Sequence, residues 1–377
     1  MDPERLPDPT SQIAQERVQP GPPALTFWVA LGIVGVALFG VLIAIGLTPT
    51  TLLPAEAAAA SSPLGLVDRL GTEASRILSA ASVASAAICV ALAGRRLLHS
   101  DGAGILAAAI LALDPGTLAL GRLALPDSIA LGALAGALAC FLSARDAMHW
   151  VGSGLLALAA LAEPTALLWG IPLGTMALLR GHIYAAPRHL GESLLQGIAI
   201  PGAVALVGVV SGVAQPPCVP PLSALTLSAV PFLGGIALAH NPILWLGGLG
   251  SLAILAIATL VGMGRQVRVA RLPGRLQLRL PDAVHPMAGR ILWLAALGLV
   301  APFPGAWMIV AALGLAAGVV WLSEDAPGFG LAVALVVVGF GVIGLARSWS
   351  LVTGAAADPA VQLAGLLPWS HAVACPP

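Results

Sequence analysis

Runs of about 20 apolar residues recur along the whole chain, and they restrict the possible folds more than any other feature. The 377 residues are 58% hydrophobic and only 9% charged, with a mean hydropathy of +0.97. Soluble domains carry about 25% charged residues, so this composition excludes a soluble globular chain and a disordered one. The alternating segments of about 10 residues that build a membrane barrel are absent from the sequence. The sequence therefore predicts an all-α, polytopic membrane protein.

Eleven segments are predicted to be transmembrane helices. The first, residues 27–47, is longer than the apolar core of about 7–15 residues in a secretory signal peptide, so we expect a retained span. The rival interpretation is a cleaved signal, because an alanine-rich stretch follows at 57–60. The eleven predicted segments are 27–47, 75–94, 102–115, 127–144, 150–163, 164–180, 194–214, 242–263, 291–304, 305–322 and 330–346.

Three prolines divide the shorter segments in the first half of the chain. Pro115, Pro126 and Pro164 fall at or next to segment ends. Proline removes a backbone donor and clashes with the preceding turn of a helix. We therefore expect these segments to be tilted or broken.

The segments define one domain with a tail. Residues 1–24 are rich in proline and mixed charge, and are predicted to be a disordered cytoplasmic tail. Residues 25–377 are predicted to form a single polytopic membrane domain. Its largest connections are a first outer loop at 48–74, an outer loop at 215–241 and a basic cytoplasmic loop at 264–290.

The arginines predict the orientation of the chain. All 17 cations are arginine, and an arrangement with the N-terminus inside places 13 of them on the cytoplasmic side and 4 outside. Cytoplasmic loops of membrane proteins carry such an excess. The expected protein therefore has a cytoplasmic N-terminus and an external C-terminus, in a bacterial plasma membrane. The four outer arginines are Arg69, Arg76, Arg122 and Arg347.

Two glycine pairs have the G-x-x-x-G spacing of closely packed membrane helices. They are Gly132 with Gly136 and Gly314 with Gly318. In a chain with 44 glycines the spacing also arises by chance, so we assign these pairs a packing role only.

No common motif for a nucleotide or a metal occurs in the sequence. There is no P-loop, no H-E-x-x-H, no C-x-x-C and no G-x-G-x-x-G, and the seven histidines are scattered without ligand spacing. We therefore expect no metal and no cofactor. Matched broken-helix repeats are also lacking, so a transporter is disfavoured.

The ionisable residues that remain gather at the predicted outer face. Asp114, Arg122 and Asp127 lie between the third and fourth segments, Glu163 between the fifth and sixth, and Glu56 in the first outer loop. A guanidinium there can bind the phosphate of a lipid carrier, and a carboxylate can take a proton from an acceptor hydroxyl. The same residues also fit a structural role, in which Arg122 pairs with Asp127 or Asp114 to fix a turn. Both interpretations stay open on spacing alone.

Three of these ionisable residues also fit helix-end roles. Asp127 follows Pro126 at the start of a segment, where a carboxylate caps a helix and suits its dipole. Asp114 precedes Pro115 and is suited to end a helix in a turn. Glu163 precedes Pro164 and can satisfy a break between two half-spans.

Short segments around these residues occur in the order found in a known family. They resemble the protein O-mannosyltransferase family, whose corresponding segments include His-Pro-Pro-Leu-Gly, a Leu-Asp run, Ser-Arg, Leu-Leu-Asp and Asn-Pro-x-x-Trp. The segments of this chain are Ser62-Pro63-Leu64-Gly65, Leu111-Ala112-Leu113-Asp114-Pro115, Gly121-Arg122, Leu125-Pro126-Asp127, Leu161–Leu167, Asn241-Pro242-Ile243-Leu244-Trp245, Leu351–Gly354 and Trp369.

The resemblance implies a C-type glycosyltransferase fold and transfer of a hexose from a polyprenyl-phosphate sugar at the outer face. On this interpretation Glu56 and Asp127 are the catalytic residues: Glu56 orients or deprotonates the acceptor, and Asp127 positions Arg122. Arg122 and Asp114 bind substrate, with Arg122 on the donor phosphate. The implied partners are the polyprenyl-phosphate lipid, the bilayer and other subunits of a membrane complex, with no nucleic acid.

Three departures from the family pattern support a second hypothesis. The first loop has Ala55-Glu56 where the family has Asp-Glu, Gly121 replaces the serine before the arginine, and Glu163 replaces a lysine. The scaffold is kept while the reaction centre is altered. The alternative is therefore a non-catalytic relative, a pseudoenzyme that serves as a structural or assembly subunit of a membrane complex.

The orientation gives a first prediction. We expect Arg271, in the basic loop, to be cytoplasmic and Trp369, near the C-terminus, to be external. Single-cysteine variants at these two positions, labelled from outside in intact cells, should react at position 369 and not at position 271. The opposite pattern would show that the orientation is inverted.

Overall fold

The structure is a computed structural model, and it is almost entirely α-helical. It describes residues 23–47, 69–124, 126–143, 145–174, 191–192, 194–213, 243–266, 268–272, 275–279, 288–299, 304–325 and 327–353. This confirms the predicted fold class. The predicted tail up to residue 22 and the outer loop at 215–241 lie outside these residues, as does most of the first outer loop.

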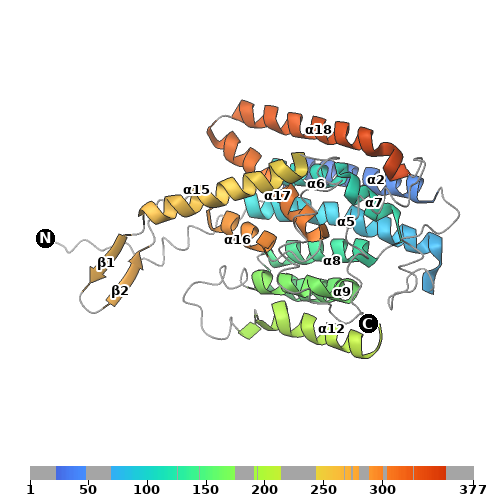
Figure 1. The fold of residues 1–377 in the computed structure, drawn as a ribbon, viewed down its shortest axis with the longest axis horizontal. Coiled ribbons are helices and arrows are strands. Elements are labelled where there is room, and N and C mark those ends of the chain that lie inside the picture. Colours follow the sequence, from blue (N-terminus) through green and yellow to red (C-terminus); the bar gives the residue numbers. More distant parts are fainter. Residues whose placement is uncertain are drawn as a thin grey trace.

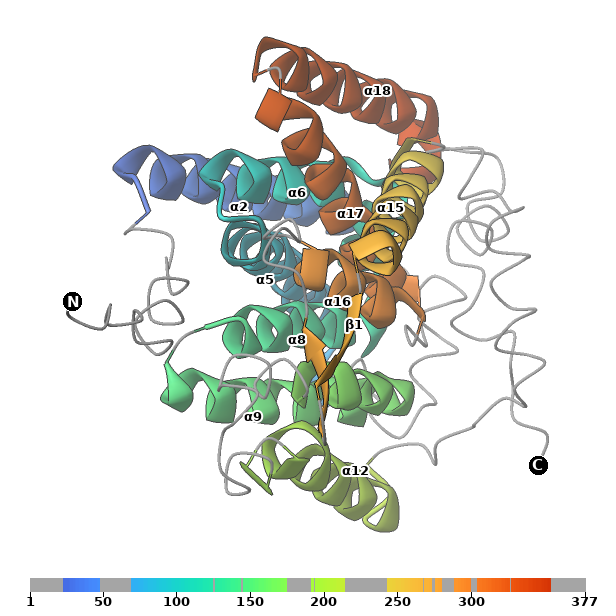
Figure 2. The ribbon, with the colours of Figure 1, turned by 90° about the vertical axis from the view of Figure 1, so that its left-hand side faces the viewer.

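The helices lie side by side along the long axis of the molecule, with α18 at one edge, α12 at the other and α5 between them (Figures 1 and 2). In chain order they are α2 (Leu25–Gly46), α5 (Thr72–Leu98), α6 (Asp101–Leu113), α7 (Pro115–Arg122), α8 (Pro126–Phe141), α9 (Asp146–Ala162), η1 (Pro164–Trp169), η2 (Leu195–Ala199), α12 (Ile200–Val210), η3 (Ile243–Leu249), α15 (Gly250–Gln266), α16 (Ala288–Leu299), α17 (Pro304–Asp325) and α18 (Pro327–Thr353).

One hairpin interrupts the helical pattern. Strands β1 (Arg268–Leu272) and β2 (Arg275–Arg279) pair antiparallel, with Arg268 opposite Arg279. The hairpin extends beyond the end of α15, away from the other helices (Figure 1). It occupies part of the predicted basic loop at 264–290, for which the sequence predicted no strand.

Each predicted segment contains helix, but the count of eleven spans is not confirmed. Within the described residues, four helices are long and apolar enough to cross a membrane, or five if α6 and α7, bent by 66°, form one span. The other apolar helices are shorter than the roughly 20 residues that cross 30 Å of hydrocarbon. The chain is an integral membrane protein in which several helices are short or broken.

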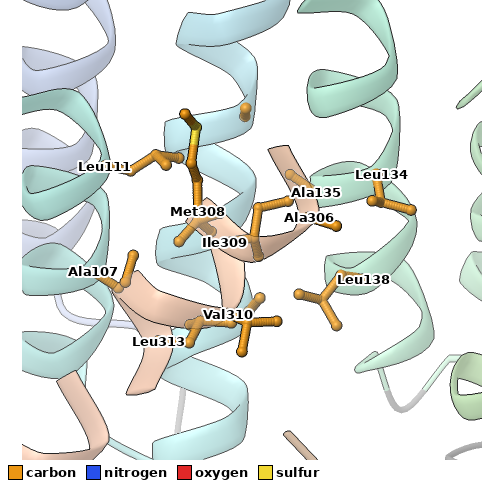
Figure 3. Close-up of a cluster of buried hydrophobic side chains, with 14 of the residues drawn as sticks. Ala107, Leu111, Leu134, Ala135, Leu138, Ala306, Met308, Ile309, Val310 and Leu313 are labelled. Atoms are coloured by element: carbon orange, nitrogen blue, oxygen red, sulfur yellow. The ribbon is translucent and has the colours of Figure 1, made fainter. Parts of the chain in front are cut away.

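The core is built around α5, which packs against α2, α6, α7 and α8. Alanine is the commonest residue on its buried face, and small residues let neighbouring backbones approach closely. A Cβ on Gly132 of α8 would lie 2.6 Å from the carbonyl oxygen of Ser82 on α5, so only glycine fits there. Apolar side chains of α6, α8 and α17 fill the space beside α5 (Figure 3).

Both predicted glycine pairs lie in such close contacts. On α17, a Cβ on Gly314 would lie 2.6 Å from the carbonyl oxygen of Gly248, and one on Gly318 would lie 2.9 Å from the Ser251 hydroxyl. On α8, a Cβ on Gly136 would meet the Leu155 side chain at 2.9 Å. The packing role assigned from the sequence is thereby confirmed.

The end of the bundle where α5 and α8 end, here called the arginine end, holds three arginines that join helices. Arg96 donates to the carbonyl of Ala139 near the end of α8, and Arg290 of α16 donates to the carbonyl of Leu97 on α5 at 3.2 Å. Arg95 pairs with Asp101, which opens α6. Their assignment to one side of the membrane agrees with this grouping.

Packing against α5 gives a second prediction. Gly132→Ala should lower stability by about 1–3 kcal/mol, because the backbone of Ser82 must move to make room. Gly154→Ala is the matched control, since nothing lies within 4 Å of a Cβ at that position of α9. Alanine favours a helix over glycine, so the control should be neutral or more stable by up to about 1 kcal/mol. Thermal unfolding of both variants in detergent would test this, and equal midpoints would contradict it.

Candidate functional site

The short helix α7 is held in place by Asp114. The Asp114 Oδ2 atom accepts hydrogen bonds from the backbone N–H of Thr117 at 2.9 Å and from its hydroxyl at 3.2 Å, and Pro115 occupies the first turn. The side chain is only 2% exposed. Asp114 is therefore the N-cap of α7, the helix-end role considered from the sequence. The Thr117 hydroxyl also lies 3.5 Å from the sulfur of Met308 on α17.

Arg122 ends α7 and is 3% exposed. It lies beside the end of α2, where a Cβ on Gly46 would be 3.4 Å from the Arg122 carbonyl oxygen. Asp114 caps the opposite end of α7, roughly 12 Å of helix away. Asp114 and Arg122 thus stand at the two ends of one short helix.

Gly121 has a packing explanation. A Cβ at this position would lie 2.6 Å from a terminal methyl of Leu42 and 3.1 Å from the Cβ of Val83. The serine of the family pattern would need both neighbours to shift. The departure at Gly121 is therefore explained by the tight contact of α7 with α2 and α5.

Asp127 lies in the first turn of α8, where its charge suits the positive end of the helix dipole. The next residue, Ser128, donates a hydrogen bond from its hydroxyl to that of Ser79 on α5 at 2.9 Å. This contact fixes the start of α8 against α5. The half-buried Asp127 carboxylate is therefore held at the end of the bundle where α5 and α8 begin, here called the site end.

Glu163 is the N-cap of η1 and lies near Asp127. Its Oε1 accepts hydrogen bonds from the Thr165 hydroxyl at 2.5 Å and from the Thr165 N–H at 3.4 Å. Glu163 therefore supplies a hydrogen-bond acceptor at the break between α9 and η1, the role considered for it from the sequence. The Glu163 charge also acts on Asp127. Two carboxyl groups from separate helix starts thus share one neighbourhood.

Arg76 is a buried arginine at the site end to which the sequence analysis gave no functional role. It lies in the second turn of α5 and is 3% exposed, with buried Ser75 and Ser79 beside it. The sequence signal was its spacing from Ser79 and Val83, three and seven residues on, which puts all three on one helical face. The sequence does not show that α7 and α8 pack on this face of α5, and that packing is what makes the face part of the site.

These residues lie on the parts of the helices that reach the site end, and they are here called the polar layer, in contrast to the apolar core. It combines guanidinium groups, which bind phosphate, with carboxylates, which accept protons. Across the part of the chain that the structure describes, no three His, Cys, Asp or Glu residues are grouped as metal ligands. Glu56, the other predicted catalytic residue, lies outside the described residues. The members of the polar layer are Ser75, Arg76, Ser79, Asp114, Thr117, Arg122, Asp127, Ser128, Glu163 and Thr165.

The fold and this layer define a helical membrane protein with an ionisable site at one end of its bundle. Residues 70–167 match the family model described as dolichyl-phosphate-mannose-protein mannosyltransferase. The match confirms, over that segment, the resemblance to the protein O-mannosyltransferase family. It runs from the start of α5 into η1 and includes every residue of the polar layer. No curated protein and no solved structure matches the chain.

The cap at Asp114 gives a third prediction. Asp114→Ala should destabilise the protein by about 1 kcal/mol, because the Thr117 N–H loses its acceptor in an apolar site. Asp114→Asn should keep most of the stability, since asparagine caps helices about as well as aspartate. Thermal unfolding in detergent would measure both. Equal losses would show that the charge matters, and not the cap.

Proposed function

We propose that this protein is a membrane glycosyltransferase that transfers a sugar from a polyprenyl-phosphate donor to an acceptor hydroxyl at the outer face of the membrane. One observation carries the proposal: the segment that matches the mannosyltransferase family model contains the whole polar layer. The printed description of the family points to mannose as the first sugar to try.

The proposed reaction needs little beyond positioning and charge. The bond between the sugar C1 and the phosphate oxygen breaks, and a bond between C1 and the acceptor oxygen forms. The polyprenyl phosphate leaves with the bonding electrons, and the acceptor proton passes to a carboxylate. Because the leaving group is a stabilised phosphate, fixed charges contribute much of the rate without requiring a metal.

Arg122 is proposed to bind the donor phosphate. It sits at the end of α7 between α2 and α5, where the apolar faces of the helices can take the lipid tail while the guanidinium meets the phosphate. The exposed faces of α2 and α18 carry large apolar side chains, as contact with lipid requires. A lipid-linked donor therefore suits both the apolar helix faces and the guanidinium of Arg122.

Asp127 and Glu56 are the proposed carboxylates of the reaction. Asp127 is held by the Ser79–Ser128 contact and sits beside Glu163, so that two acids share the site. Glu56 belongs to the first outer loop and would approach the acceptor from there. Because the Glu163 carboxylate caps η1, we assign it a positioning role.

No observation in the fold favours the non-catalytic alternative. It rests on Ala55, Gly121 and Glu163 as departures from the family pattern. Gly121 is explained by packing against Leu42 and Val83, and Glu163 by the cap it provides to η1. Only Ala55 remains as an argument from the sequence.

Arg122 gives a fourth prediction. Arg122→Ala should lower transfer from polyprenyl-phosphate mannose at least about tenfold, since one charge-assisted contact contributes roughly 1.5–3 kcal/mol. The control is Arg69→Ala, an exposed arginine just before α5, which should keep wild-type transfer. Initial rates in membranes at matched protein levels would measure both.

Glu56→Gln belongs in the same assay as a test of the second carboxylate, and it should also lower transfer. Wild-type rates in both Arg122→Ala and Glu56→Gln would show the site assignment to be wrong. Absence of transfer by the wild type with every polyprenyl-phosphate sugar tried would favour the structural-subunit alternative.

A further inference from the structure

The hairpin of β1 and β2 concentrates positive charge far from the polar layer. Four of its ten strand residues are arginine and none is acidic, whereas the chain as a whole is 9% charged. The surrounding basic loop, residues 264–290, contains six arginines and a single acidic residue, Asp282. A local excess of this size attracts anionic partners.

The hairpin begins where an apolar helix ends. Exposed apolar side chains follow α15 as far as Val261, as contact with lipid requires, and β1 starts two residues after the end of that helix. The chain then continues into α16, whose Arg290 donates to the carbonyl of Leu97 at the arginine end. The hairpin projects on that side (Figure 1). The change from apolar to cationic residues therefore marks the boundary of the membrane at the arginine end.

The register gives the hairpin two different faces. Paired residues share a face, and successive residues of a strand lie on alternate faces. One face thus takes three of the four arginines, and the other is mostly apolar. The residues on the first face are Arg268, Ala270, Leu272, Arg275, Gln277 and Arg279, and those on the second are Val269, Arg271, Leu276 and Leu278.

Two properties of this hairpin favour a surface beside it. Arg268 and Arg279 occupy directly opposite positions, and like charges so placed destabilise a strand pair. A hairpin of two strands is also only marginally stable in water. Among the described elements, β1 and β2 contact each other far more than they contact anything else. An anionic and partly apolar surface would offset the repulsion and cover the apolar face.

We propose that the hairpin binds anionic lipid: it lies in the headgroup region at the arginine end, with its arginines on lipid phosphates and its apolar face toward the acyl chains. This inference does not rest on the proposed function. A membrane surface is favoured over an acidic protein because α15 brings the hairpin to the bilayer boundary. Arginines together with an apolar face are also typical of elements that bind anionic membranes. Arg271, on the apolar face, can extend its guanidinium to the headgroups.

Hydrogen exchange of the hairpin in nanodiscs tests the proposal. The full-length protein is placed in phosphatidylcholine alone or in phosphatidylcholine mixed with phosphatidylglycerol, and amide exchange is followed by mass spectrometry. The hairpin should exchange at least about tenfold more slowly with phosphatidylglycerol, because lipid binding stabilises the paired strands. High salt should reduce this difference, since it screens the charges. Peptides from α5 serve as the internal reference and should exchange equally in both lipids.

Paired variants identify the residues responsible. Arg268→Gln with Arg279→Gln should remove most of the lipid-dependent difference, at about fivefold for each arginine. Arg69→Gln with Arg347→Gln is the matched control, because it removes the same charge from two exposed arginines predicted to lie on the outer side, and it should keep the full difference. Leu276→Asn with Leu278→Asn keeps the charge and should also reduce the difference, since the apolar face loses its contact with the acyl chains.

Three results would overturn the proposal. They are equal exchange of the wild-type hairpin in the two lipids, a wild-type difference in the Arg268→Gln and Arg279→Gln pair, and a wild-type difference in the leucine pair. Fast exchange in both lipids that slows on addition of polyglutamate would instead show an acidic protein partner and overturn the lipid assignment. Nanodiscs carry the same lipids on both faces, so the result does not depend on the orientation of the chain.

Discussion

Backbone groups at helix ends have no partner within the helix, and in an apolar bundle each bare group costs free energy. The helices of this chain are broken repeatedly, and polar side chains form hydrogen bonds with the backbone groups left unpaired at the breaks. Asp114 and Glu163 accept from the first N–H groups of α7 and η1, while Arg96 and Arg290 donate to carbonyls near the ends of α8 and α5. In a chain with 9% charged residues, this requirement accounts for the places of these four.

At both ends of the bundle, the sign of the charge depends on whether a helix starts or ends there, and Asp101 opens α6 even at the arginine end. Carboxylates cap helix starts at the site end, and guanidinium groups cap helix ends at the arginine end, each in agreement with the local dipole. Arg122 follows the rule, since it lies in the last turn of α7. Arg76 lies near a helix start instead, where it is buried and engaged within the chain.

The sequence predicted the fold class and several local features because they depend on neighbouring residues. Apolar runs identified helices, Asp114-Pro115 and Glu163-Pro164 indicated capped breaks, and the order of short motifs pointed to the family that residues 70–167 match. The count of eleven spans from hydropathy is not confirmed, since four helices within the described residues, or five with α6 and α7 as one span, are long and apolar enough to cross a membrane. It reports apolarity, and it does not tell a short or bent helix from a complete span.

The rest of the site depends on contacts between distant parts of the chain, which periodicity does not reveal. Arg76 is two turns of helix from Val83, and its importance follows from the docking of α7 and α8 on that face. The same contact explains Gly121, which from the sequence alone was a departure from the family pattern. The hairpin of β1 and β2 was also missed, because its arginines indicated only a basic loop.

The break at Asp114-Pro115 is what brings α7 into the site. A straight continuation of α6 would carry Arg122 to a point roughly 12 Å beyond Asp114 along the α6 axis. The 66° bend instead lays α7 against α2 and α5, where Gly121 contacts Leu42 and Val83. Arg122 is therefore buried beside α5 because proline and its preceding cap end α6 early. The break at Asp114-Pro115 shortens α6, and this break is what places Arg122 in the polar layer.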